Sequence, residues 1–78
     1  MPSKRNTARS RRAFAKAIRA AREQAGYSQE AFARHAGLDR SYYGAVERGV
    51  FNVTLETMLA IARGLGMSLG QLCTRAKL

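Results

Sequence analysis

The chain has few of the residues that hold small folds together covalently or through metals. Its 78 residues include one cysteine, Cys73, and one histidine, His35. A single cysteine excludes a disulfide within the chain, and the two residues together cannot supply the four ligands of a structural zinc site. We therefore expect neither a metal nor a cofactor. A domain of this length buries only about 60% of its unfolded surface, so we expect self-association to add stability.

Long apolar runs are also missing. The longest run covers residues 58–62, whereas a membrane-spanning helix needs about 20 apolar residues. The N-terminus is basic but has no apolar stretch of the kind that signal peptides carry. A lone thiol fits a reducing compartment. The sequence therefore predicts a cytoplasmic protein that does not contact a membrane.

Acidic residues are scarce. The chain has five acidic and fourteen basic residues, which gives a net charge of +9. Such a surface attracts polyanions, and without a membrane-binding segment nucleic acid is the expected partner. The chain has no Ser/His/Asp set, no paired carboxylates and no glycine-rich loop with phosphate-binding spacing. We therefore expect a binding protein and not an enzyme, with His35 at the surface.

Strand patterns are absent, and Pro2 is the only proline. The basic residues 1–9 show no apolar periodicity, which predicts a flexible N-terminal arm before a single domain over residues 10–78. Phe14, Ile18 and Ala21 recur at helical spacing, so a first helix is predicted over 11–25. Its other face carries basic residues, which are Arg12, Lys16 and Arg19.

Four further helices are predicted from residues that cap helix N-termini. The expected caps are Ser28, Asp39, Thr54 and Ser68. The predicted helices cover residues 29–36, 40–48, 55–64 and a last stretch that ends near 76. Gln71 lies three residues after Ser68, which is the spacing of a capping box. The predicted fold class is therefore all-α, with five short helices.

The connection between the second and third helices is very short. It consists of Gly37, Leu38 and Asp39, which is the spacing of a helix-turn-helix over residues 29–48. Small side chains at Ala33 and Ala36 allow the two helices to cross closely. An ordinary pair of helices in any α-helical domain is the alternative, but the positive charge and the polar start of the third helix favour DNA binding.

Several segments between residues 26 and 72 match one known pattern. They are Ser28-Gln29-Glu30-Ala31-Phe32-Ala33, Ala36-Gly37-Leu38, Val46-Glu47-Arg48-Gly49, Asn52-Val53-Thr54-Leu55 and residues 61–69. Together they resemble the phage-repressor type of helix-turn-helix, the XRE family. Within the family, residues 37–43 with Glu47, Arg48, Gly49 and Asn52 are most similar to controller proteins of restriction–modification systems.

The resemblance implies a five-helix, phage-repressor-like domain that regulates transcription of its own and neighbouring genes. It would act on double-stranded DNA in the bacterial nucleoid, with contact to RNA polymerase as a further expectation. Two alternatives stay open. One is the antitoxin of a toxin–antitoxin pair that also binds DNA, and the other is a phage or plasmid repressor.

The first residues of the second helix in a helix-turn-helix reach base edges in the major groove. Here they are Arg40, Ser41 and Tyr42. Arg40 can donate two hydrogen bonds to a guanine. Tyr43 matches a core position of the family, so Tyr42 is expected on the exposed side. Gly44 departs from the pattern, because a glycine inside a helix weakens it by about 1 kcal/mol relative to alanine.

Other contacts follow from the resemblance. It implies that Gln29 contacts phosphate and braces Arg40, and that Arg48 and Asn52 also contact phosphate. The basic face of the first helix adds Arg12 to this group. Finally, the resemblance implies an ion pair inside the fold between Arg22 and Glu47, to which we assign a structural role.

One small module reads too few base pairs to find a site in a genome. We therefore expect a homodimer on a pseudo-palindromic operator, with two dimers on tandem sites as in controller systems. The C-terminal third has more apolar residues than one small core needs, so helices within residues 55–76 are expected to pair. The expected interface residues are Met58, Leu65, Met67, Leu69 and Leu72.

Overall fold

The computed structural model describes residues 4–50 and 52–78, with side chains from residue 8 onward. Five α-helices follow one another along the chain. They are α1 (Lys4–Gln24), α2 (Gln29–Ala36), α3 (Arg40–Glu47), α4 (Leu55–Gly64) and α5 (Leu69–Arg75). The predicted all-α class with five helices is confirmed. No helix in the described part of the chain is long and apolar enough to cross a membrane.

The first helix is longer than predicted. It begins at Lys4, so Ser10, the residue before the predicted start, lies inside the helix. Residues 4–9, which the sequence assigns to a flexible arm, belong to α1, while residues 1–3 lie outside the described residues. No proline or glycine follows Lys4 in this segment. A helix that is already packed from Phe14 onward extends through lysine, arginine and alanine without needing an apolar face.

The other helix starts agree with the prediction. The side chains of Ser28, Asp39 and Thr54 accept hydrogen bonds from backbone N–H groups at distances of 2.9 to 3.1 Å. Ser68 and Gln71 form the predicted capping box. These local contacts satisfy N–H groups that a helix leaves unpaired in its first turn. The short helices therefore begin where the sequence predicts.

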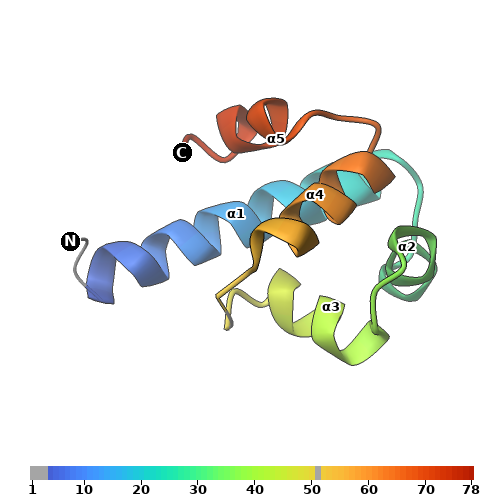
Figure 1. Ribbon diagram of the computed structural model, residues 1–78, viewed down its shortest axis with the longest axis horizontal. Helices are drawn as coiled ribbons and strands as arrows, with labels where there is room; N and C mark the ends of the chain where they lie inside the picture. Colours follow the sequence, from blue (N-terminus) through green and yellow to red (C-terminus); the bar gives the residue numbers. More distant parts are fainter. Residues whose placement is uncertain (1–3, 51) are drawn as a thin grey trace.

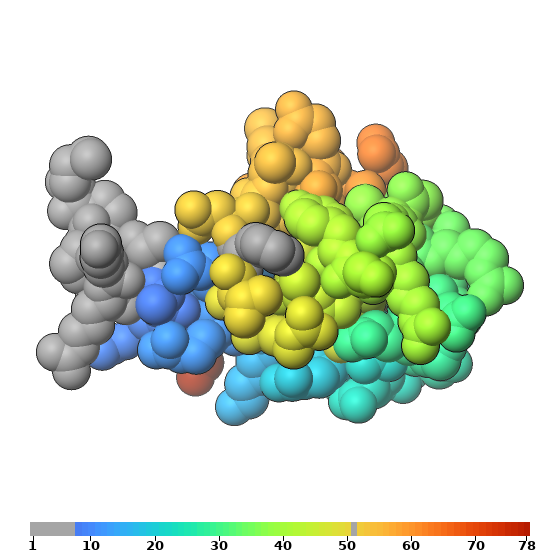
Figure 2. Space-filling model, turned by 90° about the horizontal axis from the view of Figure 1, so that it is seen from below, coloured from blue at the N-terminus to red at the C-terminus, as the bar shows by residue number. Residues whose placement is uncertain are grey.

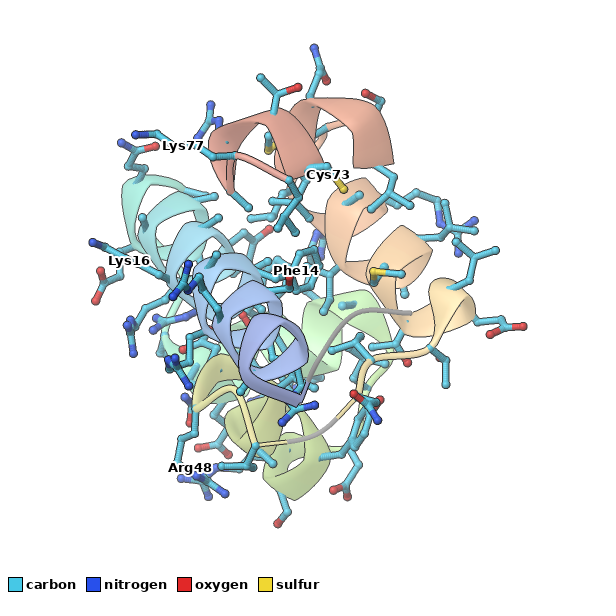
Figure 3. The ribbon with its side chains drawn as sticks, turned by 90° about the vertical axis from the view of Figure 1, so that its left-hand side faces the viewer. Phe14, Lys16, Arg48, Cys73 and Lys77 are labelled. Atoms are coloured by element: carbon cyan, nitrogen blue, oxygen red, sulfur yellow. The ribbon has the colours of Figure 1, made fainter. Side chains whose placement is uncertain are left out.

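A single cluster of buried side chains draws on every helix. Its largest fully buried members are Ile18, Phe32, Tyr43, Ile61 and Leu72. In Figure 1, α1 crosses the middle of the molecule, with α5 on one side of it and α3 on the other. Figure 3 shows Phe14 pointing from α1 into the interior, while Lys16 and Arg48 point outward. This core fixes α3 on the surface opposite α5.

The C-terminal helices expose fewer of the expected residues than predicted. Leu72 is 0% exposed, so its assignment to a dimer interface is wrong: it is needed to fill the core beside α1. Four of the expected residues are half-buried against the core, namely Met58, Leu65, Met67 and Leu69. The exposed apolar side chains of α4 are instead Leu55 and Leu59, at 57% and 39% exposure.

Candidate nucleic-acid interface

One face of the molecule is formed around α3. Figure 2 looks onto this face, where the residues after α3 (yellow) lie between α3 (yellow-green) and the early part of α1 (blue). Tyr43, Val46 and Glu47 are buried, and the helical period turns Ser41 away from them. Arg40 is the first residue of α3, and both Arg40 and Ser41 are exposed there. This is the position from which a side chain can enter a major groove.

Arg40 has a neighbour of opposite charge. Its Nη1 lies 3.8 Å from Oε2 of Glu30 on α2, and Glu30 also lies 3.9 Å from Arg34. The three side chains are exposed, so these ion pairs contribute little to stability. The brace expected from Gln29 is thus supplied by Glu30, and Arg40 can leave it for another acceptor at little cost.

Tyr42 lies between α3 and α4. It is half-buried, and its hydroxyl donates a hydrogen bond of 3.4 Å to Oγ1 of Thr57. The expectation that Tyr42 lies on the exposed side of the helix is therefore wrong. Two adjacent tyrosines point about 100° apart on a helix. Tyr43 points into the core, and Tyr42 points toward the first turn of α4. Tyr42 connects α3 to α4.

Arg22 and Glu47 form an ion pair inside the fold. Arg22 donates from Nε and Nη2 to the two carboxylate oxygens of Glu47, at 2.6 and 3.1 Å. The hydroxyl of Tyr43 donates to Oε2 of the same carboxylate, and Nε2 of Gln29 donates to Oε1 at 3.1 Å. A third donor of Arg22, Nη1, reaches the carbonyl of Tyr27 at 2.8 Å. One carboxylate therefore joins α1, α2 and α3.

The charges in this network shift one another's protonation. Burial raises the pKa of Glu47, but the hydrogen bonds from Arg22, Tyr43 and Gln29 outweigh it, so the net pKa is lowered. Burial raises the pKa of Tyr43, and its bond to Glu47 raises it further. The bond to Glu47 raises the pKa of Arg22 against the effect of burial. Glu47 is thus a fixed anion, which holds Gln29 and α3 in place.

The network around Glu47 explains why position 44 is a glycine. Gly44 is buried on the side of α3 that faces α2, and a Cβ placed there would lie 3.3 Å from Oε1 of Gln29. A side chain at position 44 would require the end of the Gln29 side chain to shift by a few tenths of an ångström. The glycine therefore leaves room for Gln29 beside α3.

The polar residues after α3 lie beside α1. Arg48 caps the end of α3, and Asn52 precedes α4; both are exposed, as is Arg12 on α1. Gly49 has a φ of 72°, and a Cβ there would lie 3.3 Å from the Cα of Arg12. The structure thus brings Asn52 and Arg12 to the α1 edge of the α3 face, while Nη1 of Arg48 lies 3.5 Å from the Cβ position of Gly44, on the Gln29 side.

A residue that the sequence analysis did not assign also lies at this edge. Nη1 of Arg11 donates a hydrogen bond of 2.8 Å to Oδ1 of Asn52. A signal was present, because Arg11 precedes Phe14 by three residues and Ile18 by seven, which places it on the inward side of α1. Its partner, 41 residues away, has no signature in the sequence.

Comparison with known proteins identifies the family. A family model described as Helix-turn-helix matches residues 18–72, which include α2, α3 and α4. The chain belongs to this family. It is a helix-turn-helix DNA-binding regulator of the XRE type, and the family is one of transcription regulators and not of enzymes.

Individual relatives show that the similarity extends to control proteins of restriction-modification systems. The chain is 42% identical to control protein C.SmaI of Serratia marcescens over 62 residues, which is 80% of this chain and 74% of the relative. The structure of the restriction-modification controller protein C.AhdI from Aeromonas hydrophila matches with a TM-score of 0.76 and 42% identity, over 80% of this chain and 94% of that one.

A more distant structure has the same fold. The clp gene regulator ClgR from Corynebacterium glutamicum matches with a TM-score of 0.82 and 25% identity, over 87% of this chain and 72% of that one. The expected resemblance to controller proteins of restriction–modification systems is confirmed.

Proposed function

We propose that the protein is the controller of a restriction–modification gene cluster. It binds a pseudo-palindromic operator as a homodimer and regulates its own gene and the genes beside it. The observation that carries the proposal is the exposed first turn of α3, with Arg40 and Ser41, on a domain that is 42% identical to control protein C.SmaI over 62 residues. The net charge of +9 supplies the attraction to DNA.

The first turn of α3 enters the major groove. Arg40 leaves Glu30 and donates two hydrogen bonds to O6 and N7 of a guanine, an interaction worth about 1–3 kcal/mol of discrimination. Ser41, beside it, is short enough for a base edge or a phosphate. The network around Glu47 holds α3 rigidly, so little order has to be gained on binding.

Backbone contacts set the register of α3 on the duplex. The N–H groups at the start of α2, around Gln29, favour binding of an anion such as a phosphate. Arg48, Asn52 and Arg12 are also exposed and carry donors. The guanidinium of Arg48 lies on the Gln29 side of α3, whereas Asn52 bonds to Arg11 on α1. One duplex is proposed to touch them all.

The second protomer pairs through α4 and α5. Leu55 and Leu59, one turn apart on α4, are exposed and apolar. Half-buried side chains on the same two helices and their connection extend this surface, namely Met58, Leu65, Met67 and Leu69. Two-fold pairing places the two α3 helices on half-sites whose centres are about 34–36 Å apart.

A binding assay tests the proposal directly. Labelled duplex from the promoter upstream of the gene is titrated with the protein in the presence of scrambled duplex and competitor RNA. We expect a complex that scrambled DNA and RNA do not displace, and footprinting across the promoter then counts the occupied sites and the dimers on them. Equal binding to promoter and scrambled duplex would refute the proposal.

Two variants separate the roles of the arginines. Arg40→Ala is expected to lose about tenfold in affinity for the promoter and to accept a changed base pair at the position it reads. Arg48→Ala is expected to weaken binding to all sequences equally, because a phosphate contact carries no sequence information. The reverse result would move base reading away from the first turn of α3.

A further inference from the structure

A polar contact joins the first helix to the segment between α3 and α4. Arg11 is half-buried on the inward side of α1, and its Nη1 lies 2.8 Å from Oδ1 of Asn52, which is exposed. Arg11 is therefore held at the edge of the core, while the outer end of Asn52 is open to a ligand.

Two described residues near Asn52 are held without Arg11. The backbone at Gly49 packs directly on α1, where a Cβ would lie 3.3 Å from the Cα of Arg12. Thr54 caps α4 through its bond to the N–H of Thr57. Gly49 and Thr54 are thus held by other contacts, and we assign to Arg11 the orientation of the Asn52 amide.

The chemistry of the two groups decides which end of the amide points outward. A guanidinium is a donor without acceptor capacity, so it can bind the amide through Oδ1 and not through Nδ2. The two N–H groups of Nδ2 are then directed away from Arg11. A backbone phosphate offers acceptors, and a reversed amide would present oxygen to oxygen. The charge of Arg11 also polarises the amide and strengthens its donors.

We propose that Arg11 is a positioning residue for DNA binding, which orients the Asn52 amide so that Nδ2 donates to one backbone phosphate. Its neighbour Arg12 is exposed and contacts the backbone itself. The inference rests on the operator binding proposed above, and it adds a residue that acts on DNA through another side chain.

A double-mutant cycle tests this role. Affinity for the promoter duplex is measured for Arg11→Ala, Asn52→Ala and the double variant. We expect Asn52→Ala to lose about tenfold, as for one hydrogen bond to a charged group, and Arg11→Ala to lose somewhat less. The double variant should bind within about twofold of Asn52→Ala, since the two losses share one contact. Losses that multiply would show that Arg11 contacts DNA by itself and would overturn the proposal.

Removing a charge from a basic protein lowers its affinity for DNA in general, so a charge control is needed. Arg75→Ala removes one charge from α5, on the other side of α1 from α3. Its loss sets the baseline that is subtracted from the loss of Arg11→Ala.

Single methylphosphonate substitutions, scanned along the half-site, give a second readout. Wild-type protein should be sensitive at the phosphate that Asn52 contacts, and both Arg11→Ala and Asn52→Ala should lose that sensitivity. Arg12→Ala should keep it and lose sensitivity at a different phosphate. A variant whose fold was only loosened would change the sensitivity at every phosphate. If Arg11→Ala kept its sensitivity at the phosphate that Asn52 contacts, the proposal would be overturned.

Asn52→Asp keeps the test valid if Arg11→Ala folds poorly. The carboxylate retains the contact with Arg11, as an ion pair, but it has no donor for a phosphate. We expect normal melting with affinity below that of Asn52→Ala, and wild-type affinity would refute the role of Nδ2. If wild-type protein shows no preference for promoter duplex, operator binding fails as a whole; if it binds and the cycle is additive, only the role of Arg11 fails.

Discussion

Single residues on α3 divide between two tasks. Arg40 and Ser41 are exposed, whereas Tyr43 and Glu47 are buried and bonded to each other. The carboxylate of Glu47 accepts hydrogen bonds from three side chains, so its burial is compensated. Removing Glu47 would leave its hydrogen-bond donors buried without an acceptor. We therefore expect changes in this network to affect folding and not base preference.

Glu47→Ala tests this expectation. The loss of one partner of a buried ion pair costs about 3–5 kcal/mol, a large part of the stability of a small domain. Urea unfolding followed by circular dichroism should show mostly unfolded protein. Glu56→Ala, which removes an exposed carboxylate from the first turn of α4, is the control and should cost less than about 1 kcal/mol. Normal melting of Glu47→Ala with altered base preference would contradict the structural role.

The same network predicts how stability depends on pH. The folded pKa of Glu47 lies below its ordinary value of 4.5, so its contribution is present above that pH and is lost as the pH falls further. The folded pKa of Tyr43 lies above its ordinary value of 10.0, so stability is also lost as the pH rises beyond that value. Urea midpoints measured across this range should fall at both ends.

Two variants test which residue causes each loss of stability. Glu47→Gln should reduce the fall of the urea midpoint at low pH, and Tyr43→Phe should reduce the fall at high pH, each at lower overall stability. An unchanged fall at low pH in Glu47→Gln would show that other carboxylates cause it.

At the scale of helices, local signals proved sufficient for boundaries that depend on caps. Ser28, Asp39, Thr54 and Ser68 each bind a nearby backbone N–H, and such contacts span three residues and can be seen in a sequence. The start of α1 was missed because nothing in residues 4–9 stops a helix or requires one. The direction of Tyr42 was missed because it depends on the distant Thr57 on α4.

The candidate site shows the same division. The pattern indicated that Arg40 and Ser41 lie at the start of a helix on the surface. It did not indicate that Glu30 pairs with Arg40 or that Arg11 bonds to Asn52, since both contacts join different helices or loops. Contacts across 10 or 41 residues depend on packing angles, which residue spacing does not encode.

The contact between the end of α3 and α1 gives a prediction at this scale. Gly49→Ala places a Cβ in a left-handed conformation, which costs about 1–2 kcal/mol, and presses it against the backbone of α1, for a further cost of about 1–3 kcal/mol. Gly37→Ala is the control, because its φ is 75° and nothing lies within 4 Å of its added Cβ. Chemical unfolding of both should show Gly49→Ala as the less stable; equal losses would mean that the α1 contact contributes nothing.

At the scale of the whole molecule, charge and apolar surface lie in different places. Arg12, Arg40 and Arg48 border the α3 face, while Leu55 and Leu59 are exposed on α4. A protomer can therefore use both surfaces at the same time. The apolar one is the surface that two-fold pairing would bury.

Leu55→Glu tests the pairing surface. The change adds a charge to the exposed surface of α4 at the start of the helix, where an acid is favourable for folding. We expect sedimentation at micromolar concentration to shift toward monomer and promoter affinity to fall more than tenfold, since two half-sites are no longer held together. Leu78→Glu, at the same exposure of 57%, should sediment like the wild type. Wild-type protein that sediments as a monomer would contradict the dimer.

The separation of tasks along α3 also bears on how such regulators diverge. Arg40 and Ser41, the side chains proposed to read bases, take no part in the carboxylate network that holds α3, so they can be exchanged without endangering the fold. Two copies of this scaffold in one cell can then bind unrelated promoters after one or two substitutions. Because the carboxylate of Glu47 is buried away from those positions, regulators of separate gene clusters can differ in sequence preference and keep the same fold.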